Sequence, residues 1–431
     1  MEKARHTLIS DDIPKKFIYL VAGLAALLPE YIGPVLTLAC FIVFKRHFSL
    51  SGQKVKMGQV GKVFLLFMCY SFISAFWSPT PIYSGAISLL WMGMLLGSFF
   101  ISNMATTRNR FENLVVCLSV GGGMVGAIAL LQYILIFANV KIPNPFWSVL
   151  DNVIYNIMPF NIDASSASWA NIRASSTFDN PLTCATYLVL VLPIAAYGFT
   201  GGKKSNRTVC GICSLFILGG IIATTSRGAA LAAIASLLVL VFINSRKVFS
   251  VIVTLITVVA GFGVALVYRT FSHSSGFMES SMDSRFKMWE ACWELIKGKP
   301  LFGYGAGCQS TAIGLKEYGI NKPHAHSLYV EMTTELGFVG IIFLAVVFGF
   351  IMYDIIKLIK SKGIYKRMGI AFLAVMVSFA IASLTEFTLQ TPKELQYFML
   401  ILGMLEAAKR LCEKEKEEQQ EQQAVPETVT K

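Results

Sequence analysis

The chain has 431 residues, of which 55% are hydrophobic and only 14% are charged, whereas soluble domains carry about 25% charged residues. Soluble cores cannot hide such an apolar surplus, so the composition excludes an ordinary soluble protein and indicates that lipid covers much of the surface. The formal net charge of +12 therefore points to membrane topology rather than to nucleic acid, because basic residues of membrane proteins gather on the cytoplasmic side.

Apolar runs recur along the chain. A spanning helix needs about 20 predominantly apolar residues, and short or re-entrant helices need fewer. The first two runs are separated by Pro29-Glu30 and could form one broken hairpin, and the first has no convincing cleavage site of a signal peptide. The sequence predicts an all-α polytopic membrane protein with about twelve transmembrane helices, at 17–29, 31–44, 63–77, 82–103, 113–139, 181–199, 208–224, 228–243, 248–268, 337–358, 368–386 and 394–411.

The basic residues alternate with these runs. If the N-terminus is cytoplasmic and every run crosses the membrane, 26 of the 37 lysines and arginines fall in the inner loops and tails. The short outer turns at 78–81 and 387–392 hold none. This alternation predicts an even number of spans, with both termini in the cytoplasm.

Two outer segments are too long to be simple turns. Residues 140–180 are rich in Trp, Phe, Pro, Asn and Ser, as expected of an interfacial segment. Residues 269–327 form a large extracytoplasmic loop, and a loop of this length is usually functional or disordered. We expect one transmembrane domain over 1–411 that includes both segments, followed by a disordered cytoplasmic tail at 412–431.

The large loop carries its own helix signal. Asp283 or Ser284 can cap a helix, and an apolar stripe follows at i, i+3, i+7 and i+10, made by Phe286, Trp289, Trp293 and Ile296. Such a stripe predicts a helix packed on the membrane surface or on the bundle.

Four arginines fall on the outer side, where basic residues of membrane proteins are disfavoured. They are Arg173, Arg227, Arg269 and Arg285. Arg227 lies between two apolar runs with almost no loop, and a guanidinium costs about 2.5–3.5 kcal/mol at a helix centre and less near the interface. Its fork can bind phosphate oxygens in bidentate fashion, and the helix that opens at Gly228 presents amides that favour an anion. The alternative is that Arg227 only anchors two helix ends.

The other three outer arginines have simple alternative explanations. Arg285 opens the predicted loop helix and could be an ordinary solvated charge. Arg173 precedes the span that starts at Pro181 and could contact lipid headgroups. Arg269 ends a span and is most simply an interfacial charge.

Two histidines, His324 and His326, form an H-A-H motif ahead of the span at 337–358. Glu331 or Glu335 could supply a third metal ligand, but this pattern is a weak zinc signal. A histidine at the outer mouth of a span suits general-base chemistry on a hydroxyl, because its ordinary pKa lies near neutrality. A capping or interfacial role is the alternative.

Other patterns give little support for a metal or a cofactor, and neither is expected. The outer segments hold no DxD or HExxH motif. The run KPLFGYGAG lacks the preceding strand of a nucleotide-binding loop, so it predicts a tight bend at Gly303, Gly305 and Gly307. Cys292 and Cys308 share one outer loop and could pair.

The outer reactive groups are cationic, which suits a substrate with an anionic leaving group, such as a polyprenyl diphosphate.

The order of four motifs over roughly 170 to 345 resembles the O-antigen ligase and O-antigen polymerase superfamily. They are RASSTFDNP at 173–181, SRGAAL at 226–231, SRFKMWEACWELIKGKPLFGYGAG at 284–307 and HAHSLYVEMTTELGFVG at 324–340. The chain departs from the family pattern at Ser327, where Asn is common, and at 174–176, where the family stretch contains glycine.

The resemblance implies a membrane-embedded glycosyltransferase of GT-C type that is inverting and independent of metal. Such an enzyme transfers a glycan from undecaprenyl diphosphate to an acceptor hydroxyl at the outer, periplasmic or extracellular, face of the bacterial cytoplasmic (inner) membrane. It serves the synthesis of cell-envelope polysaccharide, including lipopolysaccharide. By motif matching, Arg227 and Arg285 would bind the diphosphate, Arg173 would be a further contact, and His326 would be the general base, with His324 as the competing base.

Two alternatives stay open at this point. A ligase and a polymerase share the donor and differ in the acceptor, which is either a non-repeating glycan, lipid or protein, or the next lipid-linked repeat. A flippase or transporter for the lipid-linked glycan is the alternative from another class. It predicts charged groups along a path through the membrane, whereas the expected ionisable groups cluster at the outer mouth. No nucleic-acid partner is expected.

Overall fold

The computed structural model describes residues 14–30, 32–51, 55–138, 173–244, 277–389 and 391–424. Within these ranges the regular structure is helical and holds no strand. The predicted all-α fold is therefore confirmed for the described residues. Residues 14–24 are helical. The helices that follow in chain order, with η for 3-10 helices, are η1 (Ala25–Leu27), α2 (Ile32–Ser51), α3 (Gln59–Ile73), η2 (Ser74–Trp77), α4 (Pro81–Met104), α5 (Arg108–Phe137), α7 (Pro181–Thr200), η4 (Lys204–Asn206), α8 (Arg207–Ala223), α9 (Arg227–Asn244), α11 (Phe277–Gly298), α12 (Cys308–Glu317), α13 (Leu328–Ile359), α14 (Gly363–Thr385) and α15 (Pro392–Ala424).

Seven helical stretches among the described residues are long and apolar enough to cross a membrane: Gln59–Trp77, Pro81–Met104, Arg108–Phe137, Pro181–Thr200, Lys204–Ala223, Leu328–Ile359 and Gly363–Thr385. Each overlaps one of the predicted runs, so a polytopic membrane protein is confirmed. Ile32–Lys45 and Arg227–Val241 are shorter apolar helices. The run at 248–268 lies outside the described residues, and the total of about twelve spans and the GT-C type stay predictions.

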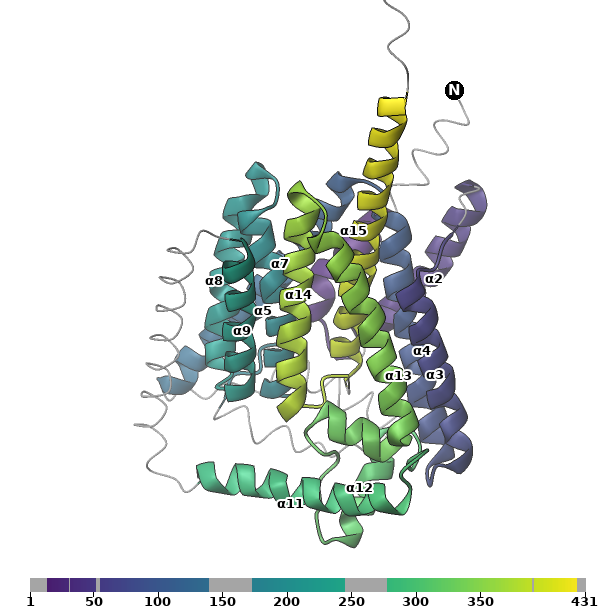
Figure 1. Cartoon of the computed structure of the whole chain (residues 1–431). Coiled ribbons are helices and arrows are strands. Elements are labelled where there is room, and N and C mark those ends of the chain that lie inside the picture. The colour runs from purple at the N-terminus through teal and green to yellow at the C-terminus, as the bar shows by residue number, and fades with distance from the viewer. Residues whose placement is uncertain are drawn as a thin grey trace, which may run out of the picture.

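α7 forms the centre of the bundle and packs on α5, α8, α9 and α14 (Figure 1). The helix starts where Asn180 caps it, because the Asn180 side chain accepts the amide proton of Leu182 at 2.9 Å and Pro181 fits the first turn. All residues from Cys184 to Ala195 are buried, as expected of a helix that is apolar on every face. This rigid start fixes the preceding segment, which carries Arg173, at one end of the bundle.

α11 lies across that same end of the bundle (Figure 1) and packs against α12 and α13. It begins at Phe277, so the predicted cap at Asp283 or Ser284 is wrong. The buried stripe also differs from the predicted one, because Met288 and Cys292 face the protein while Phe286 and Trp293 are more than half exposed. The outward face of the loop helix therefore presents Phe286 and Trp293 among charged side chains, and such aromatic residues are common at a membrane interface.

Cys292 is buried as a free thiol, so the pairing considered for it is not seen. The side chain of Cys308 and the whole of residues 139–172 and 245–276 lie outside the described residues. They include most of the outer segment 140–180, as well as Arg269.

α13 breaks at Gly337, which has a φ of 65° and a ψ of −170°. The break leaves backbone groups without helical partners, and the glycine bend of residues 300–305 supplies them. Gly305 donates to the carbonyl of Glu335 at 2.7 Å and Phe338 donates to the carbonyl of Pro300 at 2.8 Å. Gly303, Gly305 and Gly307 have φ of 65°, 98° and 99°, so the predicted tight bend is confirmed.

α15 runs from the end of the bundle next to α11 to the opposite end (Figure 1). It continues to Ala424, so residues 412–424 of the tail predicted to be disordered over 412–431 are helical, and residues 425–431 lie outside the described residues. Glu, Lys and Gln dominate this stretch and are good helix formers, and Lys414 pairs with Glu418 one turn later at 3.7 Å.

Candidate functional site

Glu386 is the centre of a charged cluster at the end of the bundle next to α11. It directly follows α14, in the turn that leads to α15. One carboxylate oxygen, Oε1, accepts a hydrogen bond from Nη2 of Arg285 at 3.0 Å. The other oxygen, Oε2, lies 3.5 Å from Nδ1 of His326. α11 and the large loop thus place two ionisable groups, Arg285 and His326, at the carboxylate that the turn supplies.

His326 is held by its backbone as well as by its ring. Its φ of 49° is in the left-handed region, which costs free energy for a residue with a Cβ. The following residues fix this conformation, because Leu328 donates its amide proton to the carbonyl of Glu386 at 3.1 Å. The surrounding contacts therefore direct the His326 ring toward Glu386 despite the unfavourable backbone.

His324 lies beside His326, with ring centroids 4.2 Å apart. Its Nδ1 accepts the backbone amide proton of His326 at 3.2 Å, so its proton in the neutral form is on Nε2. His324 is buried, whereas the side chain of His326 is 21% exposed. The two histidines that sequence could not distinguish therefore differ in position: His324 supports the loop and His326 is the more accessible ring.

The pKa values of these groups shift with burial. Burial lowers the pKa of His324 to about 3, assisted by His326 and opposed by Glu386. Burial, with the nearby charges of Arg285 and Lys322, lowers the pKa of His326 to about 4. Burial raises the pKa of Glu386 to about 7, against the effect of Arg285, His324 and Arg173. Both imidazoles are therefore neutral near pH 7, while Glu386 titrates there.

Arg173 and Arg227 join the cluster through the turn between α8 and α9. Arg173 donates from Nε to the carbonyl of Thr224 at 2.9 Å, and Arg173 is close enough to Glu386 to affect its pKa. Arg227 is the first residue of α9 and is exposed. A Cβ on the next residue, Gly228, would collide with Thr385 Oγ1, so the start of α9 packs against the residue that precedes Glu386.

The structure thus brings together all five predicted site residues at one end of the bundle. Arg285, His326 and His324 are linked through Glu386 by the distances given above. Arg227 flanks them at the start of α9, and Arg173, from the segment before α7, contacts the α8–α9 turn through Thr224. Ser176 and Thr225 in these flanking segments have φ of 55° and 53°. The non-glycine residues with left-handed backbone among those described are these two and His326, which marks this region as one where strain is retained.

Glu331 and Glu335 hold the loop rather than the histidine rings. Glu331 Oε2 accepts the amide proton of Ala325 at 2.5 Å, between the two histidines, and Glu335 Oε2 accepts that of Gly307 at 2.7 Å. Both residues are fully buried. Within the described residues no group of three His, Cys, Asp or Glu side chains is placed to hold a metal ion.

Sequence reasoning missed Glu386 and a second buried pair close to the Arg173 segment. Lys393 is fully buried; its Nζ donates to the carbonyl of Thr177 at 2.9 Å and lies 3.7 Å from Glu30 Oε2 and 4.1 Å from the centre of the Phe178 ring. One sequence signal could have identified Glu386: it is an acidic residue directly after a span, on the side that also holds the outer arginines. Only the fold shows that this turn touches the H-A-H loop.

Residues 212–345 match the family described as O-antigen ligase. This stretch contains Arg227, Arg285, His324 and His326, whereas Arg173 and Glu386 lie outside it. No curated protein matches the chain. The match supports a membrane role in glycan transfer for polysaccharide biosynthesis, and it confirms that this chain is similar to the O-antigen ligase superfamily over residues 212–345.

Proposed function

We propose that the protein transfers a glycan from undecaprenyl diphosphate to an acceptor hydroxyl, with inversion and without a metal, at the outer face of a bacterial inner membrane. The proposal depends on one observation above all: His326 and Arg285 meet on the two oxygens of Glu386. A base and a phosphate-binding cation are thereby held next to each other. The family match and the cationic flank of Arg173 and Arg227 support the same reaction.

In the proposed step, Nε2 of His326 takes the proton from the acceptor hydroxyl. The acceptor oxygen attacks the anomeric carbon as the bond from that carbon to the diphosphate oxygen breaks, so the configuration inverts. The bonding electrons leave with the diphosphate, whose added charge Arg227, Arg285 and Arg173 neutralise.

Glu386 explains why His326 would act through Nε2. A carboxylate facing Nδ1 favours the tautomer with the proton on Nδ1, which leaves the Nε2 lone pair free, and it stabilises the imidazolium that forms. Arg285 keeps further N–H donors for phosphate while one is on Glu386. His324 is a positioning residue in this scheme, because its Nδ1 is already an acceptor for the backbone of His326.

The test uses the purified full-length chain and a synthetic polyprenyl-diphosphate-linked glycan. We expect transfer without nucleotide, and the same rate after EDTA treatment. His326→Ala should lower the rate by about 10²- to 10⁴-fold, as for loss of a general base. Arg227→Lys should lower it by about 10²-fold, because a point charge does not replace a bidentate fork.

Lys297→Ala is the matched control, since Lys297 is an exposed outer cation whose ion pair among the described residues is with Glu294 of the same helix. It should leave the rate unchanged. Transfer that survives both His326→Ala and Arg227→Ala, or that stops with EDTA, contradicts the proposal. A product ladder from the donor alone identifies a polymerase, whereas a requirement for a second acceptor identifies a ligase.

A further inference from the structure

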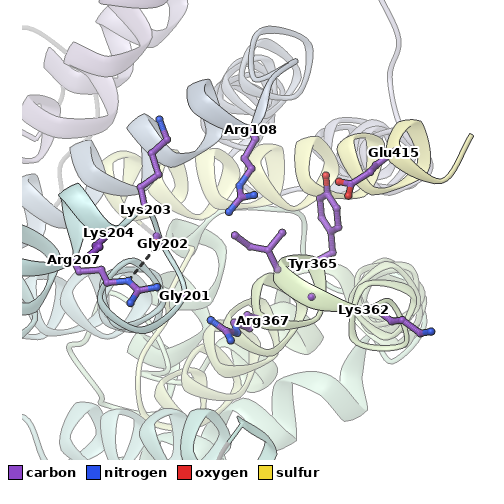
Figure 2. Close-up of a pocket in the computed structure, with 12 residues that line it drawn as sticks. Arg108, Gly201, Gly202, Lys203, Lys204, Arg207, Lys362, Tyr365, Arg367 and Glu415 are labelled. Atoms are coloured by element: carbon purple, nitrogen blue, oxygen red, sulfur yellow. Dashed lines mark hydrogen bonds between the residues drawn. The ribbon is translucent and has the colours of Figure 1, made fainter. Parts of the chain in front are cut away.

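A cavity of about 710 Å³ lies at the end of the bundle opposite the candidate site. It is formed where the starts of α5, α8 and α14 approach one another beside α15 (Figure 2). Its lining includes the buried loop glycines Gly201 and Gly202. The cavity shares no residue with the glycan-transfer site.

Six basic residues line this cavity, against a single acidic one, Glu415: they are Arg108, Lys203, Lys204, Arg207, Lys362 and Arg367. Figure 2 shows the guanidinium groups of Arg108, Arg207 and Arg367 turned toward the shared space, whereas Lys362 points away from it. Arg207 is fixed in this direction because its Nε donates to the carbonyl of Gly202 at 3.2 Å.

Glu415 and Glu112 are the acidic groups described near this cavity. Glu415 lies beside the Tyr365 hydroxyl, which donates its proton to the carbonyl of Leu411 at 3.3 Å. Glu112 is buried beneath the cavity, where it accepts from the Tyr197 hydroxyl at 2.9 Å and from the amide of Lys203 at 3.4 Å. Within the described residues none of the six cations makes an ion pair with a carboxylate. The net charge facing the cavity is therefore strongly positive.

The backbone adds to this positive field. Arg108 is the first residue of α5, Arg207 of α8 and Gly363 of α14, so three helix N-termini end at the cavity. The N-cap residues Asn206 and Lys362 make no side-chain cap, which leaves amide protons of α8 and α14 for another acceptor. Helix N-termini and arginine forks both favour phosphate oxygens.

The positive-inside rule alone accounts for basic residues at this end, but not for their arrangement around a hollow. The depth of the cavity matches a lipid headgroup, because it lies at the ends of apolar helices. The helices below it present exposed apolar side chains, among them Phe199 at 53%, Val209 at 42% and Ile212 at 51% exposure. Acyl chains could lie along this surface while a phosphate occupies the cavity.

We propose that this cavity binds the phosphate of an anionic phospholipid on the cytoplasmic leaflet, between Arg108, Arg207 and Arg367. Basic pockets between membrane helices on the cytoplasmic side suit anionic headgroups of this kind. A free phosphate ester shares the same chemistry, and the experiment separates the two sources. The site is independent of the proposed glycan transfer.

The test is native mass spectrometry of the full-length chain in detergent, titrated with dioleoylphosphatidylglycerol. The variant Arg108→Gln/Arg367→Gln removes two cations that face the cavity. The control Lys360→Gln/Lys366→Gln removes two exposed cations at the same end that do not line it. We expect the first pair to weaken phosphatidylglycerol binding by about 25-fold, or about fivefold per cation, and the second pair to change it less than about twofold.

Equal weakening by the two pairs would show a general surface attraction and overturn the proposal, as would equal affinity for phosphatidylcholine. Inorganic phosphate and glycerol 3-phosphate form the soluble arm. If they bind with the same dependence on Arg108 and Arg367 while phosphatidylglycerol does not, the lipid source is overturned. Monodisperse size-exclusion profiles for both variants confirm folding, and no readout requires glycan transfer.

Discussion

One carboxylate organises the candidate site at the scale of single residues. Glu386 contacts Arg285 and His326 with different oxygens, and the charge of Arg173 reaches it as well. Protonation of Glu386 therefore affects both the proposed base, His326, and the proposed phosphate-binding residue, Arg285. Deprotonated Glu386 orients His326, whereas protonated Glu386 loses much of its attraction for both neighbours.

We expect glycan transfer to increase as the pH rises through about 7, since the pKa of Glu386 is raised to about 7 and its ionised form is the active one. His326, with its pKa lowered to about 4, is already neutral over this range and does not limit the rate. Glu386→Gln should remove this rise and lower the rate by about 10²-fold or more. The measurement is kcat/KM between pH 5 and pH 9, and an unchanged profile in Glu386→Gln contradicts the role of this residue.

The two histidines should respond differently to substitution. His324→Ala should lower kcat by about tenfold, because only the hydrogen bond to the His326 amide is lost. His324→Asn should restore most of the activity, since its amide oxygen can accept the same proton. His326→Asn should remain as inactive as His326→Ala. A reversal, with His326 tolerant and His324 essential, would make His324 the base.

Sequence identified the cations of the site and missed the anion for a physical reason. An arginine on the outer side contradicts a strong topological rule, so each one stands out. An outer glutamate contradicts no rule, and its role depends on a contact between α14 and a loop about 60 residues earlier in the chain. Likewise, His324 and His326 are distinguished by the hydrogen bond that a backbone amide donates to the ring of His324. Sequence spacing does not reveal this bond.

At the scale of elements, the break in α13 and the glycine bend form one unit. Backbone amides of the glycine bend donate to the carbonyls of α13 that the break leaves without helical partners. Backbone amides of α13 after the break donate to carbonyls of the bend. Both need glycine, because a Cβ on Gly303 would collide with the carbonyl of Glu335 and one on Gly337 with the carbonyl of Leu301. Their mutual fit places the loop that carries His326 at the end of the bundle next to α11.

Gly337→Ala should destabilise the protein by about 2–4 kcal/mol, since its backbone lies in a region essentially restricted to glycine and the new Cβ has no room. Gly349→Ala in the same helix is the control. No atom lies within 4 Å of its added Cβ, and alanine favours a helix by up to about 1 kcal/mol over glycine. Thermal unfolding in detergent should show a lower midpoint only for Gly337→Ala, and equal midpoints would contradict the paired-break description.

Apolar length predicted most elements well, and capping chemistry predicted the loop helix poorly. Seven predicted runs match spans because hydrophobicity alone decides which segments enter a bilayer. α11 instead starts before its best cap residues and buries Met288 and Cys292 in place of two aromatics. At an interface both faces of a helix can be apolar, so periodicity does not tell which one meets the protein.

At the scale of the whole molecule, the two ends of the bundle differ in chemistry. One end holds a mixed cluster of arginines, histidines and buried carboxylates, and the other a cavity dominated by six cations. The bundle between them carries the apolar spans. The positive-inside rule predicts that the second end faces the cytoplasm.

This orientation predicts labelling by a membrane-impermeant maleimide. Lys316→Cys, exposed on α12, should react in spheroplasts or intact cells with a permeable outer layer, whereas Lys360→Cys should react only after the inner membrane is opened. The parent chain gives a low background, because its described cysteines are buried or half-buried. The opposite pattern would place the histidine cluster in the cytoplasm and exclude the proposed reaction.

The path of α15 has a practical consequence for measuring binding. This helix begins next to the histidine cluster and is still helical at Ala424, beyond the far end of the bundle (Figure 1). A tether attached after Ala424 would immobilise the molecule with its outer face toward the flowing solution. Lipid-linked glycan could then reach His326 unobstructed on a sensor surface, while the cavity near Glu415 would lie close to the anchor.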